Sequence, residues 1–553
     1  MKVAKIHNWL FADFETTGPK YFALHNYTKV YLAGLQDPLG NFWYYSDIST
    51  FWQRLQDITV NTIVYFHNLA FDITFLEYFW TKNQISYIKK LNGTGRIIYA
   101  EVRIKHKTYK RKRLVEETVT LQFRDSLLLL NGSLDALAKS FKLDLKIAKD
   151  VHFYDRETYE ITQDEITYLK RDVDILRQLI LIIFKRFDIV ENPPLTAASL
   201  SRKNLYKECL AQKQHDALFS LPEELDTALR PYYYGGFCYL NPKYANQLLP
   251  SVSAIDVNSF YPAIMVKEPL IFGQPKPYKG YFKDPFNVQF HIIALNGELK
   301  PSSHPYLMKK GYLGKNNYIT ETDGDILIGL WDFEINLVKA RYVFSKFEYI
   351  TTYSFKVLNE NPLKPYLLKL YQNKQITKGA EKQLNKIILN SLYGKYGQRP
   401  DNLSKIITSF YPTPENTGTE EFKTVSYVPL AMYITAKARF ILNTYIDMFG
   451  DNFIYCDTDS IYFTDDLPRG IIISDKIGDW DLEHSKEPAK FLAQKIYKIG
   501  NTNKLVGLSK KAQQGLTFAD YEYGKVFTAT NLKQKKVEGG CILLAQDYEI
   551  KKR

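Results

Sequence analysis

The stretch Tyr455-Cys456-Asp457-Thr458-Asp459-Ser460 places two carboxylates one residue apart between two apolar runs, 453–455 and 461–463. Side chains at i and i+2 of a β-strand share a face, so the pattern predicts a tight hairpin from which Asp457 and Asp459 project together. Hard cations such as Mg²⁺ need few protein carboxylates when a substrate supplies phosphates, so the pair of carboxylates predicts a nucleotide as the ligand. An ordinary turn with backbone-bonded Asp side chains is the commoner explanation, so other segments must decide.

A second acidic segment, 253–262, lies about two hundred residues upstream. A short β-type run ends at Asp256, and Pro262 falls in the first turn of a predicted helix, where proline is tolerated. Backbone amides after Asp256 would be free to bind phosphate oxygens. The alternatives are a capping role for Asp256 and a core position for Tyr261.

A third segment, 379–395, predicts a helix because good helix formers flank an apolar stripe and no proline interrupts it. Lys386, Asn390 and Tyr393 lie at i, i+4 and i+7, hence on one face, and would suit a triphosphate, a sugar and a base edge. A preceding predicted helix, 364–373, leads to Lys374. Two antiparallel helices joined near 377–379 would bring both lysines to one anion, although a solvated face explains either lysine alone.

Taken in chain order, the segments around Asp256, Lys386 and Asp457 resemble motifs A, B and C of B-family DNA polymerases, and Lys495-Ile496-Tyr497 resembles the Lys-x-Tyr motif before the thumb of that family. The resemblance implies a right-hand polymerase domain with palm, fingers and thumb. It assigns two Mg²⁺ ions, with Mn²⁺ as an alternative, to Asp256 and Asp459, with Asp457 assisting.

The same resemblance distributes the substrate contacts. It implies that the triphosphate is bound by Lys374 and Lys386, with Asn390 beside them and Tyr393 packed at the nascent base pair. Tyr261 would lie against the sugar, where a 2′-hydroxyl would clash. Lys495 and Tyr497 would contact DNA.

The N-terminal third contains an independent set of acids. Asp13 and Glu15 follow an apolar run on one face of a predicted strand, Asp72 closes the segment 68–72, and Tyr168 and Asp172 lie at i and i+4 of a predicted helix. Four carboxylates could hold two metals, one activating water and one stabilising the leaving oxygen, although Asp72 and Asp172 singly fit surface charges or caps.

Together these segments resemble the three motifs of a 3′-5′ proofreading exonuclease with a ribonuclease-H-like fold. The resemblance adds DNA contacts by Asn68, Phe71 and Ser126.

The segment Tyr233-Tyr234-Gly235-Gly236 narrows the subfamily. Protein-primed phage polymerases have a Tyr-x-Gly-Gly segment there that holds DNA between the two active sites, which implies DNA contacts for Tyr233, Gly235 and Gly236; a plain turn is the alternative. That subfamily implies two insertions, a terminal priming protein, deoxynucleoside triphosphates as substrates and strand-displacing replication of a linear phage genome.

Length and composition bound the domain organisation. With 553 residues we expect an α/β and α+β multidomain protein, and Glu191-Asn192-Pro193-Pro194 predicts a linker. The family resemblance, and not composition, then implies an exonuclease domain over 1–190 and a polymerase domain over 191–553, with fingers near 360–398, insertions near 300–360 and 399–424, and a thumb near 481–553.

Charge and cysteine usage set further bounds. A net charge of +13 favours a polyanionic partner, and four dispersed cysteines predict neither a zinc site nor a disulfide framework. We expect no membrane contact, because no apolar run is long enough to span a bilayer. The phage resemblance implies a monomer in the host-cell cytoplasm. Two alternatives remain: a nuclease-only or nucleic-acid-binding protein with a structural C-terminal half, and a B-family polymerase that uses only an ordinary primer.

Overall fold

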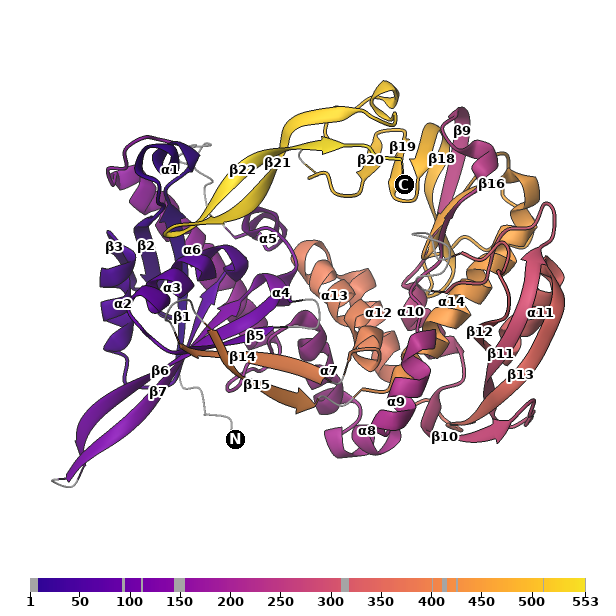
Figure 1. The fold of residues 1–553 in the computed structure, drawn as a ribbon, viewed down its shortest axis with the longest axis horizontal. Coiled ribbons are helices and arrows are strands. Elements are labelled where there is room, and N and C mark those ends of the chain that lie inside the picture. Colours follow the sequence, from indigo (N-terminus) through magenta and orange to yellow (C-terminus); the bar gives the residue numbers. More distant parts are fainter. Residues whose placement is uncertain are drawn as a thin grey trace.

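The computed structural model describes residues 8–91, 95–110, 113–143, 155–309, 318–399, 401–409, 415–423, 426–510 and 512–552. The strands within these ranges form sheets of nine, seven, four and two strands. Figure 1 shows the N-terminal sheet on the left and the four-stranded sheet on the right, with the helices labelled α12 and α13 between them. Within the described ranges, no helix combines the length and the apolar character that crossing a membrane requires.

The nine-stranded sheet has the order β15-β14-β5-β6-β7-β4-β1-β2-β3. Its strands are β1 (Asn8–Thr16), β2 (Val30–Gln36), β3 (Phe42–Tyr45), β4 (Thr62–Phe66), β5 (Tyr87–Leu91), β6 (Ile97–Lys110), β7 (Arg113–Asp125), β14 (Asp401–Ser409) and β15 (Glu415–Lys423). The helices near it are α1 (Pro19–His25), α2 (Ile48–Gln56), α3 (Leu69–Lys82), α4 (Leu127–Leu130), α5 (Leu134–Ser140) and α6 (Gln163–Arg186). The hairpin β14–β15 joins this sheet by antiparallel pairing of β14 with β5, so a late segment extends an early sheet.

The helix α6 starts at a capping box in which Thr162 and Glu165 satisfy each other's backbone amides. Its buried face, which includes Leu169, Val173 and Leu176, packs on β1 and β2. The helix therefore crosses the strand that bears Asp13 and Glu15.

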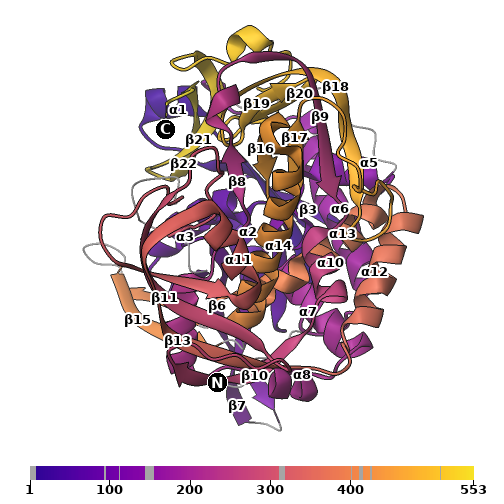
Figure 2. The same ribbon diagram turned by 90° about the vertical axis from the view of Figure 1, so that its right-hand side faces the viewer.

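The seven-stranded sheet has the order β20-β19-β18-β9-β17-β16-β8. Its strands are β8 (Cys238–Leu240), β9 (Leu248–Val257), β16 (Phe453–Asp457), β17 (Ser460–Phe463), β18 (Trp480–Ala493), β19 (Ile496–Ile499) and β20 (Thr502–Leu505). The helices α10 (Phe260–Lys267) and α14 (Val428–Phe449) pack against each other beside it, as Figure 2 shows. Because β9 lies between β17 and β18, residues about two hundred positions apart meet at its end.

The remaining elements surround this sheet. The four-stranded sheet consists of β10 (Ile271–Lys279), β11 (Val288–Leu299), β12 (Ile326–Trp331) and β13 (Tyr342–Val357). Further helices are α7 (Ala197–Glu208), α8 (Gln212–Leu218), α9 (Glu223–Leu229), α11 (Asp332–Arg341), α12 (Lys364–Ile376) and α13 (Gly379–Tyr396), and short 3₁₀ turns are η1 (Arg230–Tyr232), η2 (Pro242–Tyr244), η3 (Gly450–Asn452) and η4 (Phe518–Asp520). The two helices predicted around 364–373 and 379–395 are confirmed, and they pack against each other.

A C-terminal hairpin, β21 (Val526–Val537) and β22 (Gly540–Glu549), reaches back to the N-terminal part, as the yellow strands in Figure 1 show. The Thr28 amide donates to the Glu538 carbonyl at 2.8 Å. Gly539 has φ +90, and a Cβ there would lie 1.8 Å from the Thr28 carbonyl oxygen. This contact between the ends of the chain therefore requires glycine at that position.

Candidate active sites

The first site lies where β9 is flanked by β17 and β18. Asp256 faces Ser460 in the register of one neighbour and Asp481 in that of the other, and the Val257 amide donates to the Asp459 carbonyl at 2.8 Å. Asp256, Asp459 and Glu483 interact electrostatically, and we call them the central acidic cluster.

Burial and mutual repulsion perturb the central acidic cluster. Burial raises the pKa of Asp256 to about 8, with further contributions from Asp459 and Glu483. Burial and then Asp457 raise the pKa of Asp459 to about 6, and Lys386 opposes both shifts. Buried carboxylates that repel each other favour a bound cation, which removes the cost of ionising them.

Asp457 has different surroundings from Asp459. The strand β16 ends at Asp457 and Thr458 has φ +67, so strand alternation does not extend across the turn as the sequence suggested. The Asp457 carboxylate lies 3.4 Å from the Lys495 ammonium, and Lys495 itself has φ +61. Asp457 is therefore already paired with a cation of the chain.

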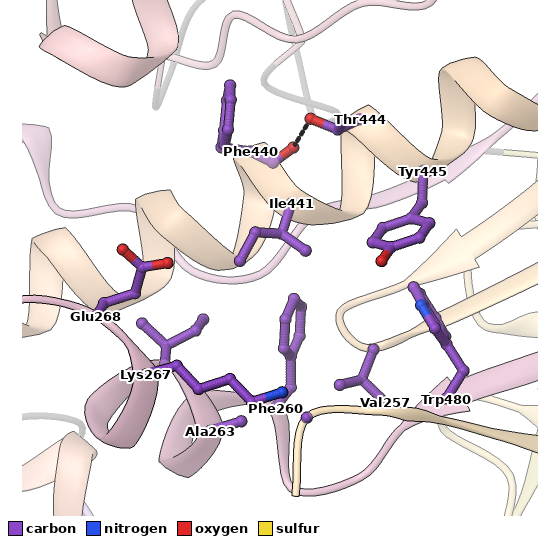
Figure 3. A pocket seen from close by; sticks show the side chains of 12 residues that line it. Val257, Phe260, Ala263, Lys267, Glu268, Phe440, Ile441, Thr444, Tyr445 and Trp480 are labelled. Atoms are coloured by element: carbon purple, nitrogen blue, oxygen red, sulfur yellow. Dashed lines mark hydrogen bonds between the residues drawn. The ribbon is translucent and has the colours of Figure 1, made fainter. Parts of the chain in front are cut away.

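A cavity of about 310 Å³ lies between α10 and α14, as Figure 3 shows. Val257 and Phe260 line it, and Tyr445 and Trp480 pack edge to face with ring centroids 5.0 Å apart. Lys267 at its rim is paired with Asp479 at 3.4 Å. This mainly apolar space therefore supports α10 and offers no free lysine for a phosphate.

A second cavity, of about 340 Å³, lies where the end of β9 and the start of α10 meet α12 and α13. All the residues predicted to bind nucleotide line it together with two of the acids: Tyr261, Lys374, Lys386, Asn390, Tyr393, Asp256 and Asp459. We call it the nucleotide cavity.

Several side chains of the nucleotide cavity are preorganised. The rings of Tyr261 and Tyr393 lie with centroids 4.2 Å apart, and the Lys374 ammonium donates to the Ser259 hydroxyl at 3.0 Å. The Asn390 side-chain oxygen is buried without a hydrogen-bond partner. Burial, and then repulsion from Lys386, lowers the pKa of Lys374. A bound anion would relieve this repulsion between the two lysines.

The glycines of the segment 233–236 make close contacts. A Cβ on Gly236 would lie 2.6 Å from the Thr458 hydroxyl, in the turn between the two motif carboxylates. The Tyr233 ring packs against Gly397, just after α13, and the Arg439 guanidinium donates to the Gly235 carbonyl at 2.9 Å. The segment therefore bridges α13, α14 and the acidic turn.

The second site is a cavity of about 820 Å³ beside β1. Four predicted acids line it from three elements, and we call them the N-terminal acidic cluster: Asp13 and Glu15 on β1, Asp72 on α3 and Asp172 on α6. Asn68 and Phe71 also line it, and their DNA contacts stay a prediction.

The N-terminal acidic cluster is strongly perturbed. Burial, and then Asp172, raises the pKa of Asp13 to about 8. Burial and repulsion from Asp13 raise the pKa values of Glu15 and Asp72 well above their usual range. The Asp72 Oδ1 atom is buried without a hydrogen-bond partner, so the cluster fits a metal ion that would accept its oxygens.

Asp172 and Tyr168 are partly engaged by the chain itself. Burial raises the pKa of Asp172, and Arg171, 3.2 Å away, opposes the shift. The Arg171 guanidinium lies over the Tyr168 ring, 4.7 Å from its centroid. Tyr168 is not among the residues that line the cavity.

Two residues predicted to contact DNA lie in the interior. Ser126 is fully buried, and its hydroxyl bonds the His67 ring at 2.9 Å. The Tyr497 ring is buried, and its hydroxyl bonds that of Tyr462 at 2.8 Å. These groups support the residues around them, whereas Lys495 of the same motif reaches Asp457.

Some residues of both sites were not identified from the sequence. Glu483 belongs to the central acidic cluster, and only its alternation with Asp481 along a strand could have indicated it. The cavity of the N-terminal acidic cluster is closed by Leu532, Gln534 and Cys541 of the C-terminal hairpin. No local pattern predicts a contact across more than 450 residues.

Neither acidic cluster is a closed metal-binding cage within the described residues. Within the described ranges, no group of three or more His, Cys, Asp or Glu side chains is placed to hold an ion by itself. Both clusters consist of hard oxygen donors, so substrate phosphates and water would complete the coordination.

Comparison with known proteins identifies relatives of the whole chain. The family model described as DNA polymerase type B, organellar and viral, matches residues 58–154 and 149–468. The DNA polymerase of Bacillus phage PZA is 30% identical over 540 residues, covering 89% of this chain and 92% of the phage protein. The DNA polymerase of Streptococcus phage Cp-1 is 28% identical, covering 88% and 87%.

The same relationship holds for solved structures. Phi29 DNA polymerase complexed with primer-template DNA and incoming nucleotide superposes with a TM-score of 0.86 at 28% identity, covering 99% of this chain and 100% of that one. The complex of the same polymerase with single-stranded DNA gives 0.85 at 28% identity. The multidomain fold class expected from the sequence is confirmed.

Proposed function

The chain belongs to the organellar and viral type B DNA polymerases and is a DNA-directed DNA polymerase, and we propose that the nucleotide cavity is where it adds deoxynucleotides. The observation that supports this is that Asp256 and Asp459 share one cavity with Lys374 and Lys386. Acids for metal ions and lysines for a triphosphate are the two requirements of phosphoryl transfer.

In this proposal each side chain has one task. Asp256 and Asp459 would hold two Mg²⁺ ions, which when bound activate the attacking hydroxyl and neutralise the triphosphate; Mn²⁺ would serve as well. Lys374 and Lys386 bind the phosphates. Tyr261, fixed by its contact with Tyr393, lies against the sugar and excludes a 2′-hydroxyl.

Asp457, Asn390 and Lys495 complete the polymerase site. Asp457 would assist at the metal ions, either as a ligand or through the groups around them, and it also pairs with Lys495. Lys495 would contact the DNA. The unpartnered Asn390 oxygen turns to the incoming nucleotide. Tyr233, Gly235 and Gly236 hold the strand that passes between the two sites.

We propose that the N-terminal acidic cluster is a 3′-5′ proofreading exonuclease. Asp13, Glu15, Asp72 and Asp172 would hold two metal ions around the scissile phosphate, and Tyr168 would act beside Asp172. Asn68 and Phe71 hold the single-stranded end, with Ser126 as a buried support. The cleaved strand end then lies against the C-terminal hairpin that closes the cavity.

The phage relatives support a protein-primed mode of replication. We infer that a terminal priming protein supplies the first hydroxyl, that synthesis displaces the complementary strand of a linear phage genome, and that the enzyme acts as a monomer in the host cytoplasm. The 1–190 and 191–553 division, with two insertions, fingers and thumb, is part of this proposal. A nuclease-only protein is not favoured, because the polymerase relatives align over most of the chain.

Primer extension tests the polymerase site. Asp459→Ala should abolish incorporation of a labelled deoxynucleotide. Asp451→Ala is the control, because Asp451 is an exposed acid eight residues before Asp459, and it should leave incorporation unchanged. Equal loss in both variants would refute the assignment. Incubation with a candidate terminal protein should yield a covalent protein-nucleotide product, and extension of nucleic-acid primers alone would refute protein priming.

A further inference from the structure

The helix α6 contributes an acid to the N-terminal site and contacts a helix that lines the nucleotide cavity. Its first half bears Asp172, and its last residue, Arg186, reaches the helix α13 that bears Lys386. Asp172 and Arg186 are ~21 Å apart along the helix axis at the usual rise per residue. Figure 1 shows α13 beside the N-terminal part of the molecule.

Arg186 makes two contacts with α13 of unequal weight. Its Nη2 donates to the Asn385 side-chain oxygen at 2.9 Å, and its Nη1 lies 3.2 Å from the Glu381 carboxylate. Asn385 is only 2% exposed, whereas the Glu381 side chain is 62% exposed. Removing the partner of a buried amide costs more stability than breaking an exposed ion pair. The bond to Asn385 therefore contributes more than the pair with Glu381 to holding Arg186 on α13.

Asn385 also binds the turn between α12 and α13. Its Nδ2 donates to the Thr377 hydroxyl at 3.1 Å, and that hydroxyl donates to the Asn373 carbonyl at 2.6 Å. Arg186 therefore reaches the end of α12, next to Lys374, through Asn385.

The backbone of the same turn also lies close to the N-terminal part of the molecule. Gly379 has φ +57, and a Cβ there would lie 2.8 Å from the carbonyl oxygen of Ser140 on α5. The turn is thus seated on the N-terminal part of the molecule at two independent points.

The position of Asn385 fixes the direction of Lys386. Consecutive residues of an α-helix differ by ~100° around the axis, so Asn385 can face α6 while Lys386 faces the nucleotide cavity. Rotation of α13 that moved Lys386 out of the cavity would have to break the buried Asn385 contact.

We propose that Arg186 is a positioning residue for nucleotide addition: through Asn385 it holds α13 in the orientation in which Lys386 meets the triphosphate. The N-terminal domain is thereby a structural part of the nucleotide-binding apparatus. This inference rests on the proposed role of Lys386.

Steady-state primer extension with an Arg186→Ala variant tests the inference. The KM for the deoxynucleotide should rise about tenfold, the factor that a charge-assisted hydrogen bond commonly contributes, with a smaller change in kcat. Degradation of single-stranded DNA should stay unchanged, because Arg186 lies far from the N-terminal acidic cluster. Lys185→Ala, at the exposed neighbouring position, should leave both activities unchanged.

A double-mutant cycle separates positioning from general destabilisation. Asn385→Ala should raise the same KM, and the double variant should raise it no further, because one contact is lost in all three. An unchanged KM for Arg186→Ala, or additive effects in the double variant, would overturn the proposal. Lys386→Ala is measured alongside: if it leaves the KM unchanged, the triphosphate role of Lys386 fails, which is a different result from failure of Arg186→Ala.

Discussion

The two acidic clusters consist of the same chemical groups, carboxylates, but different side chains line the cavities around them. The nucleotide cavity is lined by Lys374 and Lys386 as well as by Asp256 and Asp459. The described residues that line the N-terminal cavity include no Lys or Arg. There the facing wall is the C-terminal hairpin, with Leu532, Ile542 and Leu543. Lysines suit a free triphosphate, and an apolar wall suits the bases of a strand end, so the facing wall decides which substrate each cluster accepts.

The sharpest way to break this comparison is to disable one cluster at a time. Asp256→Asn should lower nucleotide addition about a thousandfold while nuclease activity persists, because an amide cannot hold a metal ion as a carboxylate does. Asp13→Asn combined with Glu15→Gln should do the reverse. Primer extension and degradation of labelled single strands measure the two activities; loss of both from either change would show that the clusters do not work separately.

The ribose contact should give the next largest effect. Tyr261→Val removes the ring that fills the space beside the sugar, so discrimination against ribonucleotides, measured as the ratio of kcat/KM values, should fall about a hundredfold. Tyr261→Phe keeps the ring and should keep the discrimination. An unchanged ratio in the valine variant would remove Tyr261 from this role.

The hairpin wall can be tested through Gly539. Gly539→Ala places a methyl group against the Thr28 carbonyl and should shift the hairpin, lowering nuclease activity about tenfold with a smaller effect on primer extension. Gly524→Ala is a matched control, because Gly524 also has positive φ, +84, but no atom lies within 4 Å of the added methyl. Equal effects of the two changes would mean that backbone strain, and not the contact with Thr28, is responsible.

Local patterns predicted the parts of the fold whose causes are local. The helix bearing Lys386, the hairpin at Asp457 and the strand ending at Asp256 follow from periodicity, proline placement and turn residues. The motif order then placed the acids and lysines that the nucleotide cavity brings together.

The parts that sequence could not predict depend on long-range packing. The addition of β14 to β5 joins residues some three hundred positions apart, and the pairing of Asp457 with Lys495 depends on positive φ at Thr458 and Lys495. Ser126 and Tyr497 occupy motif positions, yet tertiary contacts bury both. A motif fixes residue type, whereas neighbours distant in sequence fix what the side chain faces.

The smallest expected effect concerns stability without metal. Asp13 and Asp256 have folded-state pKa values of about 8, raised above the usual 3.8, so their protonated forms favour the fold. This contribution is fully present below pH 4 and is lost as pH rises through 8, so the Tm of the metal-free protein should fall by several degrees between pH 5 and pH 8. Added Mg²⁺ binds the ionised carboxylates and should raise the Tm more at pH 8 than at pH 5. Asp13→Asn and Asp256→Asn should each reduce the pH dependence of the Tm of the metal-free protein. Calorimetry of the two variants shows which cluster, when ionised, lowers the Tm more. A Tm that rises with pH in the chelated protein would contradict the raised pKa values.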